Sequence, residues 1–132
     1  MFERFRGEKG QALVEYALVL PLLLLLVFGI IDLGIAVFSY DTIANAAREG
    51  ARYGIIDPHN AAEIELRTRR LTSGLDPSRL VFSCPTCAEA APRTVRVELT
   101  YQVRLITGPV IRAVGGNPFM DLRAGATMQV ED

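Results

Sequence analysis

An apolar segment near the N-terminus constrains this chain more than any other feature. Apart from Pro21, residues 17–31 include no polar or charged side chain, and the apolar character extends back to Ala12 with the carboxylate of Glu15 inside it. A helix rises about 1.5 Å per residue, so the roughly 20 residues of 12–31 can cross a hydrocarbon core about 30 Å thick. The sequence therefore predicts one membrane-spanning helix.

The apolar segment is also compatible with two simpler roles. A cleaved secretory signal combines a basic start with an apolar stretch, although its best small-residue cleavage site, residues 44–46, lies past Asp32 and well beyond the apolar run. A plain single-pass anchor without processing is the second role. A carboxylate inside a membrane-length segment is costly, so Glu15 calls for a more specific function.

The charge pattern predicts the orientation of the span. Residues 1–10 carry three basic and two acidic side chains, and basic residues at the start of a span favour the cytoplasm. The C-terminal part is then extracytoplasmic, where disulfides persist. The net charge of −1 and the scattered basic residues argue against a nucleic-acid partner.

Gly10 is followed five residues later by Glu15 and then by Tyr16. This spacing resembles the processing site of type IV prepilins, especially those of the tight-adherence (Tad or Flp) pilus system. The sequences of residues 10–22, 29–34 and 45–53 are similar to the TadE-like family. The resemblance is specific from Gly10 to Tyr53, and beyond it only a weak strand pattern remains.

The resemblance implies that a prepilin peptidase cleaves after Gly10 and frees the amine of Gln11. Other type IV pilins carry phenylalanine at this position, so the peptidase would be of the Tad type. In pilin-like assemblies the glutamate equivalent to Glu15 pairs with the new amine of a neighbouring subunit, which relieves the cost of a lone carboxylate in hydrocarbon. Alternatively, Glu15 is protonated or reaches the membrane interface.

Three further residues are candidates for setting the register of assembly. Tyr16 belongs to the processing motif. Pro21 frees the carbonyl of Ala17 and either lets the helix loosen on leaving the bilayer, as in pilins, or introduces a harmless kink. Asp32 either marks the outer membrane interface or forms a salt bridge between subunits.

After Asp32 the pattern becomes that of an amphipathic helix ending near Tyr53 or Gly54. The predicted stripe recurs at steps of four and three: Leu33, Val37, Tyr40, Ala44, Ala47, Ala51 and Gly54. A second row, Ala46, Gly50 and Gly54, has small-xxx-small spacing, which allows close packing within the chain or against another subunit.

Residues 55–132 predict a small α/β head. Asp57 is expected to cap a helix from Pro58 to about Leu71. Residues 80–83, 94–103 and 122–130 predict strands, the last two with alternating apolar side chains, and residues 108–114 predict one or two helical turns. The expected fold is α+β and pilin-like: a transmembrane and stem helix (11–54), preceded by a cleaved cytoplasmic leader (1–10), packs on an antiparallel sheet of about three strands.

Cys84 and Cys87 allow four interpretations: a structural disulfide, free thiols, a redox pair or half of a zinc site. Zinc needs about four ligands, and His59 is the obvious third. No catalytic triad order, phosphate-binding loop or metal-ligand spacing is present. We therefore expect a structural disulfide, no metal, no cofactor and no catalysis.

These features predict a membrane-anchored minor pilin or pseudopilin located in the cell membrane. Whether it enters the shaft or tip of the pilus, or only the assembly machine, stays open at this point. The resemblance implies four kinds of partner: the prepilin peptidase, the major and minor pilins, the inner-membrane assembly platform and membrane lipid. One competing interpretation is a single-pass binding module whose head never enters a filament. Another is a membrane-tethered thiol oxidoreductase.

Overall fold

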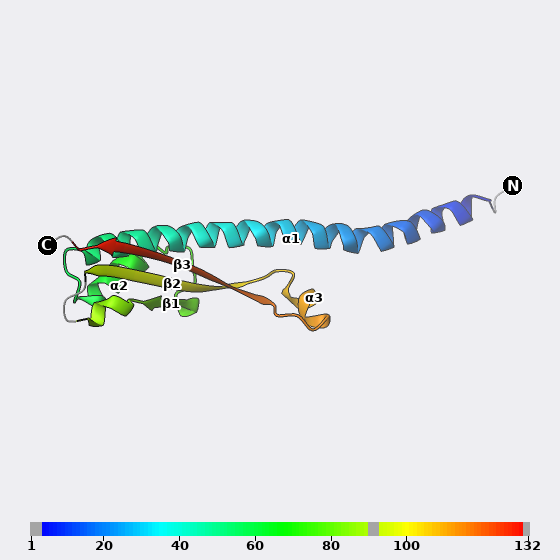
Figure 1. Cartoon of the computed structure of the whole chain (residues 1–132). Helices are drawn as coiled ribbons and strands as arrows, with labels where there is room; N and C mark the ends of the chain where they lie inside the picture. Colours follow the sequence, from blue (N-terminus) through cyan, green and yellow to red (C-terminus); the bar gives the residue numbers. More distant parts are fainter. Residues whose placement is uncertain (1–3, 90–92, 131–132) are drawn as a thin grey trace.

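One 51-residue helix, α1 (Arg4–Gly54), runs the length of the molecule, and the remaining elements lie alongside it between its middle and its C-terminal end (Figure 1). The structure is a computed structural model and describes residues 4–89 and 93–130. Residues 1–3 of the expected leader lie outside the described residues. The helix ends at Gly54, as the sequence predicted.

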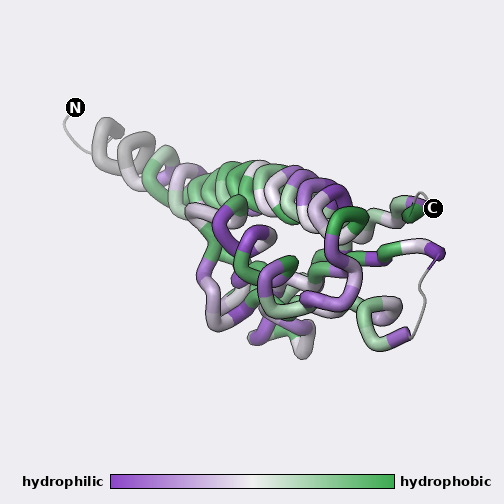
Figure 2. Tube along the Cα trace, turned by 90° about the vertical axis from the view of Figure 1, so that its left-hand side faces the viewer, coloured by the Kyte–Doolittle hydropathy of each residue, from purple (hydrophilic) through white to green (hydrophobic). Residues whose placement is uncertain are grey.

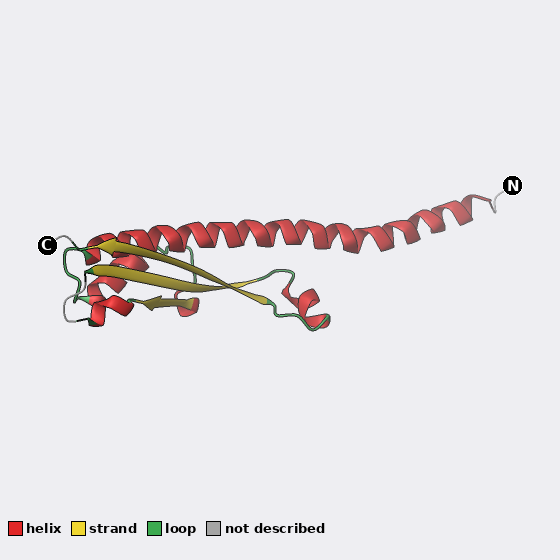
Figure 3. Cartoon of the chain, viewed as in Figure 1, coloured by secondary structure: helices red, strands yellow, loops and turns green. Residues whose placement is uncertain are grey.

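The head is a three-stranded antiparallel sheet packed on α1, with the strand order β1-β2-β3 (Figure 3). Its elements are α2 (Ala61–Arg70), the 3-10 turn η1 (Pro77–Arg79), β1 (Leu80–Ser83), the 3-10 turn η2 (Pro85–Ala88), β2 (Thr94–Arg104), α3 (Gly108–Ala113) and β3 (Phe119–Gln129). The predicted α+β class, with a long N-terminal helix on a three-stranded antiparallel sheet and short helices, is confirmed.

The core lies between β2, α1 and α2. Every second residue of β2 is buried, as the alternation predicted: Val95, Val97, Leu99, Tyr101 and Val103. These side chains meet Ile43 and Ala47 of α1 and Ile64 of α2. Fully burying one Val, Leu or Ile side chain stabilises a fold by about 1.5–3 kcal/mol. A head of this size therefore depends on α1 for a large part of its core.

The stem of α1 buries a different stripe from the predicted one. Leu33, Val37 and Tyr40 are 65%, 54% and 48% exposed. The buried residues lie about one position earlier along the stem: Asp32, Ala36, Ser39 and Ile43. The prediction took the larger apolar residues for the inward face, whereas the head packs against the polar and small ones. Ala47, Ala51 and Gly54 of the predicted stripe are buried, as expected.

Two predicted boundaries in the head were wrong. Helix α2 begins at Ala61, not Pro58, because Asn60 rather than Asp57 caps it: the Asn60 side chain accepts a hydrogen bond from the Glu63 amide at 3.2 Å. Strand β3 begins at Phe119 rather than Leu122, because it pairs with β2 as far as Arg104.

Strands β2 and β3 continue as a two-stranded hairpin beyond the end of β1, toward the N-terminal half of α1 (Figure 1). Strand β1 pairs with only four residues of β2, from Glu98 to Tyr101. Helix α3 closes the far end of the hairpin. We call residues 105–120, the connection between β2 and β3 together with the first two residues of β3, the hairpin lobe.

Candidate functional site

The apolar half of α1 protrudes from the head without cover. All residues from 10 to 31 are exposed, and Figure 2 shows this part of the helix as mainly hydrophobic. Among the described residues, one helix is long and apolar enough to cross a membrane, and it is this one. The helix therefore fits a single-pass membrane anchor.

The residues of the predicted processing motif lie at the exposed start of this apolar segment. A side chain at Gly10 would meet nothing within 4 Å. Gln11 is the next residue, and its side-chain amide donates a hydrogen bond at 3.4 Å to the carboxylate of Glu15, one turn further along the helix. Glu15, Tyr16 and Val19 line a shallow hollow of about 230 Å³. This surface is accessible to another protein, such as a peptidase or a neighbouring helix.

Pro21 lies within α1, which continues through it as helix. It also lines an apolar groove of about 390 Å³ between α1 and the hairpin lobe. The side of α1 contributes Leu22, Leu24, Leu25 and Phe28, and the lobe contributes Ile106, Thr107, Pro109 and Val110. No sequence pattern indicated this groove, because its two walls are some 80 residues apart in the chain.

Asp32 joins the stem to the hairpin lobe. One carboxylate oxygen accepts a hydrogen bond from the Ile106 amide at 2.6 Å. The other oxygen accepts from the Thr107 amide at 2.9 Å and the Thr107 hydroxyl at 2.6 Å. Asp32 is only 5% exposed and Thr107 only 9%. This contact, which we call the Asp32 clasp, lies within one chain. It gives Asp32 a role that the sequence did not indicate, in addition to the two predicted ones, a mark of the outer membrane interface and a salt bridge between subunits.

The small-residue row faces the interior of the head. A Cβ at Gly50 would overlap Thr68 Oγ1, and one at Gly54 would lie 2.6 Å from Val95 Cγ1. Ala46, the first member of the row, is fully buried. The row therefore brings α1 close to α2 and β2 of the same chain, which is the intramolecular one of the two packing alternatives.

Cys84 and Cys87 form a disulfide across the 3-10 turn η2, with 5.5 Å between their Cα atoms. Cys87 is buried in the core cluster. Between them, the hydroxyl of Thr86 accepts a hydrogen bond from the Arg96 amide at 2.9 Å. Two contacts therefore hold the turn against the head: the buried side chain of Cys87 and the hydrogen bond between Thr86 and Arg96. This arrangement is typical of a structural disulfide.

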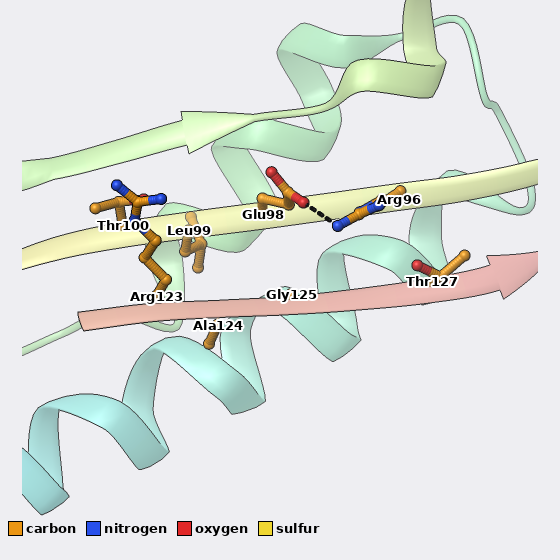
Figure 4. Close-up of a pocket in the computed structure, with 8 residues that line it drawn as sticks. All are labelled: Arg96, Glu98, Leu99, Thr100, Arg123, Ala124, Gly125 and Thr127. Carbon is orange, nitrogen blue, oxygen red and sulfur yellow. Dashed lines mark ion pairs between the residues drawn. The ribbon is translucent and has the colours of Figure 1, made fainter. Parts of the chain in front are cut away.

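The outer face of the sheet carries a shallow polar cleft of about 430 Å³ over β2 and β3. Figure 4 shows Arg96 paired with Glu98 on β2, and Arg123 of β3 extending toward Thr100. No group of three or more His, Cys, Asp or Glu that could hold a metal ion occurs in the described part of the chain. The cleft thus offers hydrogen bonds and charge to a polar ligand.

Comparison with known proteins identifies the N-terminal segment. Searches of curated proteins and of solved structures found no match. A family model described as TadE-like protein matches residues 10–52. The match begins at Gly10 and ends two residues before the end of α1, so it covers the apolar anchor and the stem but not the head. Over residues 10–52, the chain is therefore similar to TadE-like proteins.

Proposed function

We propose that this chain is a membrane-anchored minor pilin or pseudopilin that takes part in assembling a Tad/Flp-type pilus. One observation carries the proposal: the TadE-like match, residues 10–52, includes the whole segment 10–31, whose residues are all exposed and almost all apolar up to the Asp32 clasp. The exposed part of this helix before Pro21 lies outside both the core and the groove, so it can exchange lipid for neighbouring helices without disturbing the head.

The proposed mechanism starts with removal of residues 1–10 by a prepilin peptidase. The processed helix then moves from the bilayer into a bundle of pilin helices. Lipid tails are as apolar as leucine, so apolar packing alone gives little preference for one register. Pairing between Glu15 and the new amine of Gln11 on a neighbouring subunit supplies that preference, because an unpaired charge is penalised in both environments.

N-terminal sequencing and intact mass of the membrane-extracted protein test the processing step, with and without the cognate prepilin peptidase. We expect a chain that starts at Gln11 only when the peptidase is present. Gly10→Val should block cleavage, and Gly7→Val is the matched control because it leaves the spacing from Gly10 to Glu15 intact. A start at Met1 in every case would refute the proposal.

A filament-incorporation assay tests the role of Glu15. Glu15→Ala should be processed normally but incorporated several-fold less, since only the partner of the new amine is removed. Glu49→Ala is a suitable control: Glu49 is an exposed glutamate of the same helix, 4.0 Å from Arg52 in a surface ion pair that contributes little. Normal incorporation of Glu15→Ala would rule out the pairing mechanism.

The polar cleft on the sheet favours a second candidate, a single-pass binding module whose head recognises an extracytoplasmic ligand. This function requires neither cleavage nor a filament. It predicts that residues 1–10 are retained in the presence of the peptidase. It also predicts that Arg123→Ala impairs the biological activity of the protein while leaving its membrane insertion unchanged.

A further inference from the structure

We propose that the hairpin lobe is a second membrane contact, inserted into the outer leaflet beside the helix that anchors the chain. The proposal rests on α1 crossing the membrane and is independent of the role in a pilus. It assigns a function to residues 105–120, which neither the processing motif nor the family match includes.

The first argument is the position of the lobe along α1. The groove lining places Ile106, Pro109 and Val110 beside residues 21–28, which belong to the apolar segment. Figure 1 likewise shows α3 next to the middle of α1 rather than next to its head end. At about 1.5 Å per residue, residues 21–28 lie roughly 5–15 Å inside the end of the apolar segment at Ile31. A bilayer that surrounds residues 12–31 therefore meets the lobe as well.

The second argument is the composition and exposure of the lobe. Arg112 is the single charged residue between Leu105 and Met120. Several of the large apolar side chains point outward, and Val114 is 82% exposed. Interfacial elements commonly bury such a surface about 5–10 Å into the headgroup and acyl boundary. The long side chain of Arg112 can extend to the lipid phosphates while its carbon chain remains among apolar groups.

The third argument is the state of the backbone, because amide groups without partners are excluded from lipid. Pro109 and Pro118 have no amide hydrogen. Ten other amides of the lobe donate hydrogen bonds to acceptors within the lobe or to Asp32: those of Leu105, Ile106, Thr107, Gly108, Val110, Ile111, Val114, Gly115, Gly116 and Phe119. The Asp32 clasp thus also satisfies the two amides that approach α1. Such a loop can enter the interface without leaving those donors unpaired.

The apolar groove between α1 and the lobe follows from the same geometry. Its walls are almost wholly apolar. In a bilayer that surrounds residues 12–31, both walls would be at the depth of the acyl chains. The occupant that fits is a lipid acyl chain, whose headgroup phosphate then lies on the Asp32 side of the groove. A helix of a second copy is the competing occupant, and the experiment separates the two.

The chain has no tryptophan, so one introduced tryptophan reports on a single position. Val114→Trp places the probe in the lobe. Val81→Trp is the matched control, because Val81 is a 62% exposed valine on β1 in the head. Both full-length variants are reconstituted in vesicles of phosphatidylethanolamine and phosphatidylglycerol, with and without brominated acyl chains. Val110→Trp, at a 51% exposed position of α3, repeats the measurement in case Val114→Trp distorts the lobe.

We expect emission at shorter wavelength for the lobe probes than for Val81→Trp. Quenching by acrylamide from water should be several-fold weaker for the lobe probes, and quenching by brominated lipid several-fold stronger. Equal acrylamide quenching of lobe and control probes would overturn the proposal. A second copy in the groove would give a different result: the lobe tryptophan would be shielded from acrylamide only until the protein is diluted in excess lipid, and brominated lipid would not quench it. That result would overturn the proposal. Either result leaves the processing at Gly10 untouched.

Discussion

Removing the acceptor of the Asp32 clasp should release the hairpin lobe from the stem. Asp32→Asn keeps the size of the side chain but replaces one oxygen, which accepts hydrogen bonds, with an NH2 group, which donates them. The remaining oxygen can serve either Ile106 or Thr107, and the other donors are left facing an NH2 group. Asp32→Ala removes both acceptors.

The size of the effect follows from the three hydrogen bonds. A hydrogen bond to a charged group contributes about 1.5–3 kcal/mol net, and a buried donor left unpaired costs about 1–3 kcal/mol. Thr107, which supplies two of the three donors, is buried, whereas Ile106 is only partly buried. We expect Asp32→Ala to destabilise the clasp by about 3 kcal/mol, which corresponds to roughly a hundredfold faster exchange of protected amides. Asp32→Asn should lose about half of that free energy.

Hydrogen–deuterium exchange of the full-length protein in micelles measures this effect directly. Residues 105–116 should exchange faster in both Asp32 variants, while the core residues of β2 exchange at the wild-type rate. Asp41→Asn is the matched control, since Asp41 is an exposed aspartate of the same helix. Wild-type exchange of the lobe in Asp32→Ala would show that the clasp does not hold the lobe, and the reasoning would be refuted.

Further predictions concern the head. Gly50→Ala should destabilise it by about 1–3 kcal/mol in urea, because the new Cβ would meet Thr68 Oγ1, which is held by its bond to the Ile64 carbonyl. Gly34→Ala, with nothing within 4 Å, should be neutral or stabilising, and equal effects of the two variants would contradict this packing argument. Replacing both Cys84 and Cys87 by serine should lower the free energy of unfolding by about 2 kcal/mol, as the loop-entropy model gives for so short a loop. Assembly activity at permissive temperature should persist in this variant, whereas its loss without unfolding would indicate a redox role.

Local patterns in the sequence predicted the elements whose side chains alternate or repeat over many residues. β2 is an example: five alternate apolar residues fix both the strand and its buried face. The start of α2 was less predictable, because Asp57 and Asn60 are both good caps and only the observed side-chain bond to Glu63 distinguishes them.

The stem of α1 shows why hydrophobicity alone misplaced the buried face. In a water-soluble helix, Leu33 and Val37 would be expected to face the core. In this helix the apolar surface continues outward from the span, and the head is held instead by Asp32, Ala36 and Ser39. No local pattern indicates that Asp32 meets Thr107, because the partners are 75 residues apart and their contact depends on the length of the hairpin.

Because α1 is one unbroken helix, any rotation of the anchor about the helix axis turns the head by the same angle. There is no hinge between the apolar segment and Ile43 or Gly50 in the core, so the direction in which the head points is set by the side of the anchor that faces its neighbours. A shift of one residue in the axial register of the anchor corresponds to a rise of about 1.5 Å and a turn of about 100°. The way in which the apolar side chains pack within the membrane therefore sets the direction in which the sheet faces, around the helix axis, outside the membrane.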